Sequence, residues 1–156
     1  MTHVTSNEYL TFILAGQLFG VSVLQVNDVL RSQKTTRTPL APPTIAGIMN
    51  LRGRIVTVID VRRCLNQPPA SDGSGGMSVV VEQNGELFSL IIDAVGDVLT
   101  LDEDNIEPIP PTLDASWSAV AAGVYKLPDQ LLVTLDVKKL LASAQFYENS
   151  LVEGVA

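Results

Sequence analysis

The chain has 156 residues, of which 46% are hydrophobic and 17% charged, a composition that suits one globular domain or two small lobes sharing a core. Its formal net charge of −7 argues against nucleic acid as a partner, because phosphate binding needs a clustered basic face. A single cysteine and a single histidine exclude an internal disulfide, a thiolate metal cluster, a zinc site and histidine-based nucleophilic catalysis.

The N-terminus lacks the basic and apolar regions of a signal peptide, and no apolar run approaches the ~18 residues of a membrane-spanning helix. The sequence therefore predicts a cytoplasmic protein with no direct membrane insertion. His3, the sole histidine, is interpreted as a solvated residue of this N-terminal tail.

Apolar runs on either side of glycine-containing turns predict two β-hairpins. Residues 9–14 precede Ala15-Gly16-Gln17 and a second run at 19–23, and residues 77–82 precede Asn84-Gly85 and a run at 88–92. Short strands around a tight turn of this composition are typical of hairpins.

Residues 55–59 and 131–135 are further predicted strands, and their nearly continuous hydrophobicity indicates burial on both faces. Asp60 and Asp136 follow these strands, where an aspartate can accept hydrogen bonds from the first N–H groups of a helix. Short helices with outward-facing basic residues are therefore expected after each aspartate. The second belongs to a C-terminal helix and tail over about 136–156.

Two proline-rich segments are expected to lie outside the strands. Residues 42–46 contain two prolines and are expected to form a short helical turn. Residues 66–76 are rich in Pro, Gly and Ser and predict an exposed connector. A phosphate-cradling loop is disfavoured there, because no Gly-Lys-Ser/Thr follows and the charge balance is wrong.

The chain contains an internal repeat. Residues 16–19 and 26–30 recur 69 positions later, and residues 47–65 recur 76 positions later as GVYKLPDQLLVTLDVKKLL. The offset changes because the second copy carries about seven extra residues around 112–122. We therefore predict two homologous lobes, about 9–65 and 77–141, each a small β-barrel of about five short strands.

Six carboxylates gather between residues 93 and 107, where paired acids could bind calcium or perform acid–base chemistry. Their spacing lacks the alternating ligands and distal glutamate of a calcium loop, so a solvated loop is favoured for Asp93, Asp97, Asp102, Glu103, Asp104 and Glu107. Cys64, whose repeat counterpart is Leu140, is interpreted as a small buried hydrophobic residue. The residues thus predict no catalytic, metal or cofactor site.

Arg52 is the leading candidate for a functional residue. It lies in a tight Asn50-Leu51-Arg52-Gly53 turn, and its repeat counterpart is Pro128. A guanidinium held there can make bidentate hydrogen bonds to a carboxylate. Two interpretations stay open: an internal ion pair with Asp28 that braces the turn, and direct contact with a partner.

Val26, Val29 and Val98 flank the acidic repeat positions Asp28 and Asp97. A protein without catalytic groups acts by binding, and binding energy concentrates in a few apolar or arginine anchors. The three valines either line a groove between the lobes or belong to the core.

The chain resembles the CheW family, the chemotaxis coupling (adaptor) proteins of bacteria. The resemblance spans about residues 9–141 and rests on the stretches YLTFILAGQLFGVSVLQVNDVL, TPLAPPTIAGIMNLRGRIVTVIDVR, LIIDAVGDVLTL, IEPIP and GVYKLPDQLLVTLDVKKLL. The Asn-Leu-Arg-Gly turn followed by Ile-Val and by Asp-apolar-Arg is its most specific motif.

The resemblance implies a mainly all-β fold of two five-stranded SH3-like barrels in a single CheW-like domain over 1–156. It implies an adaptor, monomeric when free, that joins the helical cytoplasmic tip of chemoreceptors to the regulatory domain of a CheA-type histidine kinase and helps to build receptor arrays. The receptor-binding residues that it implies are Val26, Asp28, Gly47, Arg52 and Val98. Asp28 replaces the glutamate usual in the family, and Thr57 replaces a proline.

Alternative functions remain at this point. An adaptor of a non-chemotaxis chemosensory pathway would share the same residues. A kinase regulatory domain or an adaptor fused to a receiver is disfavoured, because 15 residues follow Leu141. No group of residues in the sequence supports a small ligand-binding module or a small enzyme.

Overall fold

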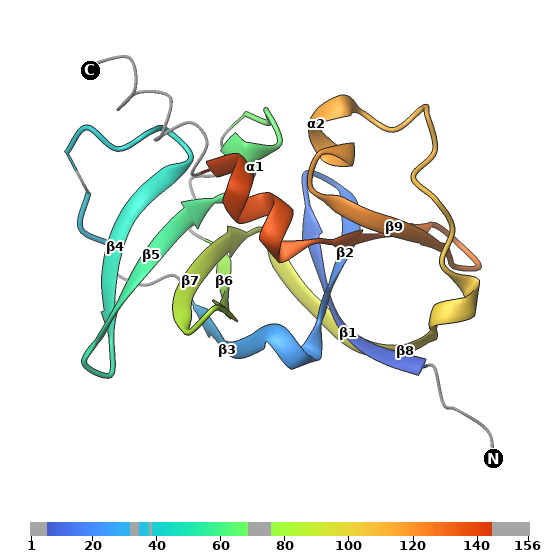
Figure 1. The fold of residues 1–156 in the computed structure, drawn as a ribbon, viewed down its shortest axis with the longest axis horizontal. Coiled ribbons are helices and arrows are strands. Elements are labelled where there is room, and N and C mark those ends of the chain that lie inside the picture. Colours follow the sequence, from blue (N-terminus) through green and yellow to red (C-terminus); the bar gives the residue numbers. More distant parts are fainter. Residues whose placement is uncertain (1–5, 32–34, 38, 69–75, 145–156) are drawn as a thin grey trace.

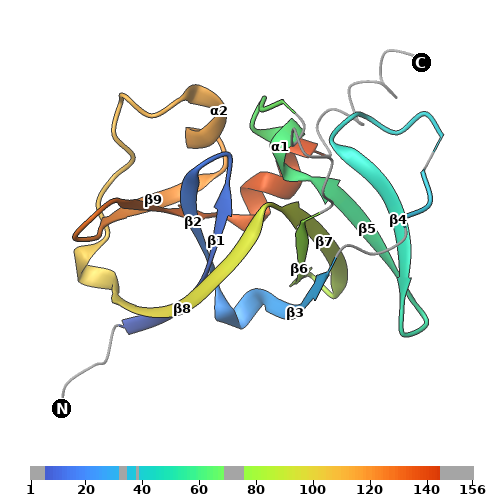
Figure 2. The same ribbon diagram turned by 180° about the vertical axis from the view of Figure 1, so that it is seen from behind.

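The computed structural model describes residues 6–31, 35–37, 39–68 and 76–144. Within them, ten strands form two five-stranded sheets, which lie side by side in Figure 1 and, from behind, in Figure 2. The first sheet has the strand order β8-β1-β2-β10-β9, with β1 Ser6–Leu14, β2 Gln17–Ser22, β8 Ala94–Asp102, β9 Ala121–Lys126 and β10 Leu131–Leu135. The second has the order β3-β6-β7-β5-β4, with β3 Val26–Arg31, β4 Ile45–Leu51, β5 Arg54–Asp60, β6 Met77–Gln83 and β7 Glu86–Ile92.

Both sheets close into barrels in the same way. The chain that leaves edge strand β3 returns to the opposite edge, where Thr36 and Ile48 of β4 exchange hydrogen bonds of 2.8 and 2.9 Å. The chain that leaves β8 does the same through Glu107 and Val124 of β9, at 2.8 and 3.0 Å. Val124 is the repeat counterpart of Ile48, so the duplication is visible in the closure itself. The prediction of two five-stranded barrels is confirmed.

The barrels are not the two halves of the chain, because the repeats at 9–65 and 77–141 each contribute strands to both barrels. The N-terminal hairpin β1–β2 pairs with β8 and β10 of the second repeat, whereas hairpin β6–β7 pairs with β3 and β5 of the first. The two repeats thus exchange their first hairpins. We call the β8-β1-β2-β10-β9 unit the first barrel and the other unit the second barrel.

The exchanged hairpins explain the continuous apolar runs. In β1, Leu10, Phe12 and Leu14 face the largest apolar cluster, which draws on both barrels, whereas Tyr9 and Ile13 face the smaller interior of the first barrel. Strand β6 alternates likewise between the shared cluster and the interior of the second barrel. Each hairpin is therefore covered on both faces, and the shared cluster holds the barrels together.

Short helical elements connect the strands. Helix α1 (Val61–Cys64) begins after Asp60, whose carboxylate accepts a hydrogen bond from Arg63 N, and Asp136 does the same for Lys139 N at the start of the helical segment 137–144. Both caps were predicted. Helix α2 (Ala115–Ser118) lies in the extra residues of the second repeat, and 3₁₀ turns η1 (Val23–Gln25) and η2 (Glu103–Asn105) complete the set.

Three expectations fall on residues that the structure does not describe, and a fourth is corrected by it. His3, residues 145–156 of the tail and 69–75 of the connector lie outside the described residues. The expected helical turn at 42–46 is wrong, since Ile45 N donates to Pro42 O in a tight turn and Ile45 already begins β4.

Candidate functional site

Arg52 and Asp28 form a direct ion pair, with 2.9 Å between Arg52 Nη2 and Asp28 Oδ2. Asp28 lies on edge strand β3, and Arg52 lies in the β4–β5 turn at the other edge of the same sheet. The pair therefore spans the seam along which the second barrel closes. The shorter aspartate reaches the guanidinium without a bridging group.

The β4–β5 turn holds Arg52 in an unusual backbone conformation. Arg52 and Gly53 both have positive φ, 51° and 84°, which is the geometry of a type I′ hairpin turn. Asn50 Oδ1 accepts a hydrogen bond of 2.9 Å from Gly53 N and fixes the turn. The Arg52 side chain is still 73% exposed while Asp28 is 24% exposed. Arg52 can therefore stabilise the turn through its ion pair and still contact a partner, because most of the paired side chain stays exposed to solvent.

Gly47 lies on β4, the strand that leads into the Arg52 turn, but is itself buried. It is buried in β4 with φ +152°, and a Cβ at this position would collide with the backbone carbonyl of Thr36. The glycine is needed for the close approach of the Thr36 segment that closes the barrel. Its influence on any partner must therefore be indirect.

Val26 and Val98 lie on edge strands of different barrels, β3 and β8, which both run along the lower side of the molecule in Figures 1 and 2. Val26 is paired with Val81 and Val98 with Leu10, and directly opposed residues point to the same face of a sheet. Because Val81 and Leu10 belong to the shared cluster, both candidate valines point toward the junction of the barrels.

The two valines differ in exposure. Val98 is 49% exposed, whereas Val26 and Val29 are partly buried against the shared cluster. The structure thus brings Asp28 and Arg52 together, places Val26 two residues along the same strand and puts Val98 across the junction. Of the two interpretations of the valines, packing against the core describes Val26 and Val29, whereas Val98 lies at the surface.

The acidic run at 93–107 divides into two kinds of residue. Asp97, Asp102, Glu103 and Asp104 are exposed, and Asp102 caps η2 through Asp104 N at 3.0 Å. Among the described residues, no group of three or more His, Cys, Asp or Glu side chains could hold a metal ion. A solvated surface is the better description for this part of the run.

Asp93 was expected in a solvated loop and Arg62 as an outward-facing basic residue, but the two form an ion pair that is mostly shielded from solvent. Arg62 Nε and Nη2 donate to the two carboxylate oxygens of Asp93 at 2.9 and 2.6 Å, in a bidentate pair only 20% and 27% exposed. Asp93 Oδ2 also accepts from Ala15 N at 2.9 Å, and Arg62 Nη1 donates to Pro68 O at 2.7 Å.

Arg62 and Asp93 were missed as a pair because each was assigned to solvent. Asp93 is the single residue between β7 of the second barrel and β8 of the first, and Ala15 lies in the β1–β2 turn of the first. The one available signal was the position of Asp93, directly after a strand that reads as buried. We call Arg62, Asp93 and the Ala15 amide the inter-barrel clamp.

Cys64 packs against the shared cluster as expected. Burial, and to a smaller degree the nearby Asp60 carboxylate, raises the pKa of its thiol from 9.0 to about 12. The sulfur therefore stays protonated at neutral pH and is a poor nucleophile.

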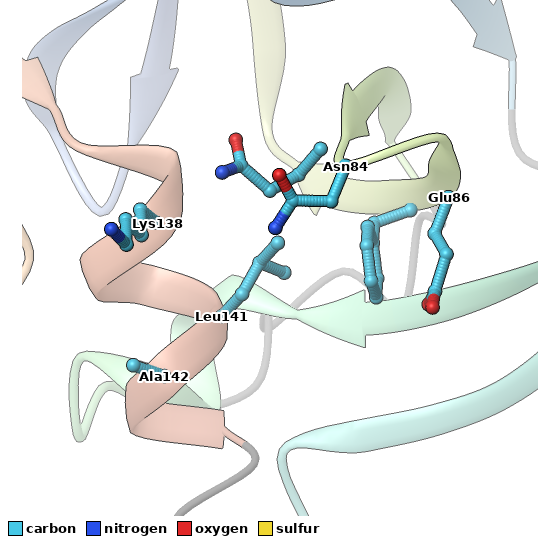
Figure 3. A pocket seen from close by; sticks show the side chains of 7 residues that line it. Asn84, Glu86, Lys138, Leu141 and Ala142 are labelled. Atoms are coloured by element: carbon cyan, nitrogen blue, oxygen red, sulfur yellow. The ribbon is translucent and has the colours of Figure 1, made fainter.

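A pocket of about 320 Å³ lies between the β6–β7 turn and the helical segment 137–144 (Figure 3). Its lining residues are Gln83, Asn84, Glu86, Phe88, Lys138, Leu141 and Ala142. None of the five candidate receptor-binding residues lines it, so it is a separate feature of the surface. In the part of the chain that the structure describes, no helix is long and apolar enough to cross a bilayer.

Comparison with known proteins places this architecture in a family. The model of the CheW-like domain matches residues 8–145. The chemotaxis protein CheW of Klebsiella aerogenes is 31% identical over 149 residues, covering 96% of this chain and 88% of that protein, and CheW of Bacillus subtilis is 29% identical, covering 88% of each. The crystal structure of the scaffolding protein TtCheW from Thermoanaerobacter tengcongensis superposes with a TM-score of 0.74 at 33% identity, over 83% of this chain and 88% of that one. The chain belongs to the CheW family.

Proposed function

We propose that this chain is a non-enzymatic chemotaxis adaptor that couples transmembrane chemoreceptors to a CheA-type histidine kinase and helps to assemble receptor arrays. The observation that carries the proposal is the match to the CheW-like domain over residues 8–145, supported by the likeness to a scaffolding protein. The adaptor works in the cytoplasm, is recruited to receptors at the membrane and is a monomer when free.

The receptor-binding site of this proposal consists of Val26, Asp28, Gly47, Arg52 and Val98. Val26 and Val98 supply apolar surface on both sides of the barrel junction, which suits the apolar stripe of a receptor helix. Arg52 supplies an exposed charge held in one place by Asp28. Gly47 contributes by keeping the β4–β5 hairpin in position.

Signal transfer requires that the receptor contact the adaptor differently in two states, because a partner with equal affinity for both states shifts nothing. The shared apolar cluster and the inter-barrel clamp make the two barrels one unit. A change in the receptor helices at the junction would therefore alter how the whole adaptor packs against the kinase.

Co-sedimentation with membrane vesicles that carry a methyl-accepting chemoreceptor tests the proposal. The chain should pellet with receptor vesicles, and kinase added to the mixture should pellet in larger amount when the chain is present. Vesicles without receptor are the control. Failure of the chain to increase the kinase in the pellet would remove the coupling role.

A further inference from the structure

The pocket between the β6–β7 turn and segment 137–144 has a counterpart at the equivalent place in the other repeat. The offsets of the repeat relate Asn84 to Ala15, Phe88 to Phe19, Lys138 to Arg62 and Leu141 to Leu65. The counterpart therefore lies where the β1–β2 turn meets α1. Corresponding residues of the two repeats line both places. A comparison of the two therefore shows which side chains are present at one place and missing at the other.

The counterpart is filled by the chain itself. Trp117 of α2 packs on Phe19 with ring centroids 5.6 Å apart, and the neighbouring Ser116 Oγ donates to Leu65 O at 3.1 Å. Helix α2 lies in the extra residues at 112–122, for which the first repeat has no equivalent. Among the described residues, no such ring packs on Phe88, which lines an open pocket instead.

The basic residues differ in the same way. The Arg62 guanidinium is matched by the Asp93 carboxylate, but the repeat counterpart of Asp93 is Leu24, which is 92% exposed. Lys138 forms no ion pair with any described residue. Figure 3 shows Lys138 and Glu86 on opposite sides of the pocket, with Asn84 between them. One side of the pocket is thus cationic and apolar, since Leu141 and Ala142 come from the same helix as Lys138.

We propose that this pocket binds a segment of a partner polypeptide that presents an aromatic side chain next to a carboxylate. The ring would pack on Phe88 as Trp117 packs on Phe19, and the carboxylate would pair with Lys138 as Asp93 pairs with Arg62. Both interactions are stabilising in a partly enclosed site. The pocket is a second polypeptide-binding site, distinct from the candidate receptor-binding residues.

The occupant of the counterpart supplies a probe. A blocked peptide with the sequence of residues 112–120 carries Trp117, the ring that fills the counterpart, together with the carboxylate of Asp114, which caps α2. Titrated into the full-length ¹⁵N-labelled chain, it should produce saturable chemical-shift changes at the amides of Asn84, Phe88, Leu141 and Ala142. Peptides with alanine for the tryptophan, or asparagine for the aspartate, should bind at least about fivefold more weakly.

Variants of the chain make the test specific. Lys138→Ala should weaken binding of the peptide about fivefold or more, whereas Lys139→Ala, the adjacent lysine that donates to Ala121 O, should leave it unchanged. Ala142→Trp fills the pocket from an exposed position and should abolish binding while the chain still unfolds cooperatively.

Three outcomes would overturn the proposal. Shifts that do not respond to Lys138→Ala and Ala142→Trp would place the peptide elsewhere. Equal binding of the three peptides would remove the requirement for a ring and a carboxylate. Nuclear Overhauser contacts between residues 145–156 and the pocket in the free chain would make the tail, rather than a partner, its occupant.

Discussion

The Arg52 guanidinium lies 2.9 Å from the Asp28 carboxylate and so ties the β4–β5 turn to the strand at the opposite edge of the same sheet. The pair holds the exposed β4–β5 turn against β3, the strand that also carries Val26. An ion pair with one largely exposed partner contributes less than about 1 kcal/mol to stability. The larger effect of the pair is to fix the position of the Arg52 guanidinium.

Reversal of this charge should affect binding more than folding. Arg52→Glu places two carboxylates together at the turn, and we expect it to weaken association with receptor vesicles by more than tenfold, ~1.4 kcal/mol. Thermal unfolding should change little. Arg54→Glu is the matched control, because Arg54 lies on the same hairpin and donates to Gly85 O instead of Asp28. Unchanged affinity in a folded Arg52→Glu chain would remove Arg52 from the site.

The inter-barrel clamp should matter for stability. Arg62→Ala removes both guanidinium hydrogen bonds from the partly buried Asp93 carboxylate, and we expect a loss of about 2 kcal/mol in the free energy of unfolding. Urea denaturation measures this loss. Arg63→Ala, which removes the neighbouring exposed basic side chain, should stay within about 0.5 kcal/mol of the parent chain.

A double-mutant cycle with Asp93→Asn isolates the contact itself. The two substitutions should be less than additive by about 1 kcal/mol, because each removes the same bidentate interaction. Additive effects would mean that Arg62 and Asp93 stabilise the chain through separate contacts.

Gly47 and Gly53 form a natural comparison, since both have positive φ but only one is crowded. A Cβ at Gly53 meets nothing within 4 Å, whereas a Cβ at Gly47 meets the Thr36 carbonyl. Gly53→Ala should cost about 1 kcal/mol from backbone strain alone. Gly47→Ala should cost about 2–3 kcal/mol and should weaken receptor binding, because the Thr36 segment must move. Equal costs measured by urea denaturation would contradict the close approach at Gly47.

The partly buried thiol of Cys64 predicts a pH dependence of stability. Its pKa is higher in the folded chain, about 12 against 9.0, so the folded state holds the proton more tightly. The resulting contribution to stability is complete below about pH 9 and is lost as pH rises from 9 toward 12. Urea denaturation at about pH 8 and about pH 10.5 should show a larger decline for the parent chain than for Cys64→Ala. Identical declines would mean that other groups dominate this pH range.

Local features of the fold could be predicted because they depend on neighbouring residues. The hairpins around Ala15-Gly16 and Asn84-Gly85, and the caps at Asp60 and Asp136, follow from turn chemistry and capping within a few positions. The turn at Pro42 was misread because two prolines suit a tight turn as well as the start of a helix.

Long-range choices could not be predicted in the same way. Hairpins β1–β2 and β6–β7 have similar apolar patterns, so each could complete either barrel, and only packing decides which. Asp28 and Arg52 were singled out because the turn at Arg52 is distinctive. Arg62 and Asp93 were not, because a basic residue on a short helix and an acid in an acidic run each look solvated until the barrels are placed.

The exchange of hairpins has a consequence for the history of the chain. Neither repeat alone contains a complete barrel, yet two identical copies trading hairpins about a twofold axis would reproduce the strand order of both sheets. The architecture is thus that of a swapped homodimer whose protomers have been fused end to end. After fusion, the β4–β5 turn and its counterpart between β9 and β10 no longer need to have the same sequence. One turn could therefore acquire Arg52 while the other acquired Pro128. A single molecule could then bind different partners through different faces.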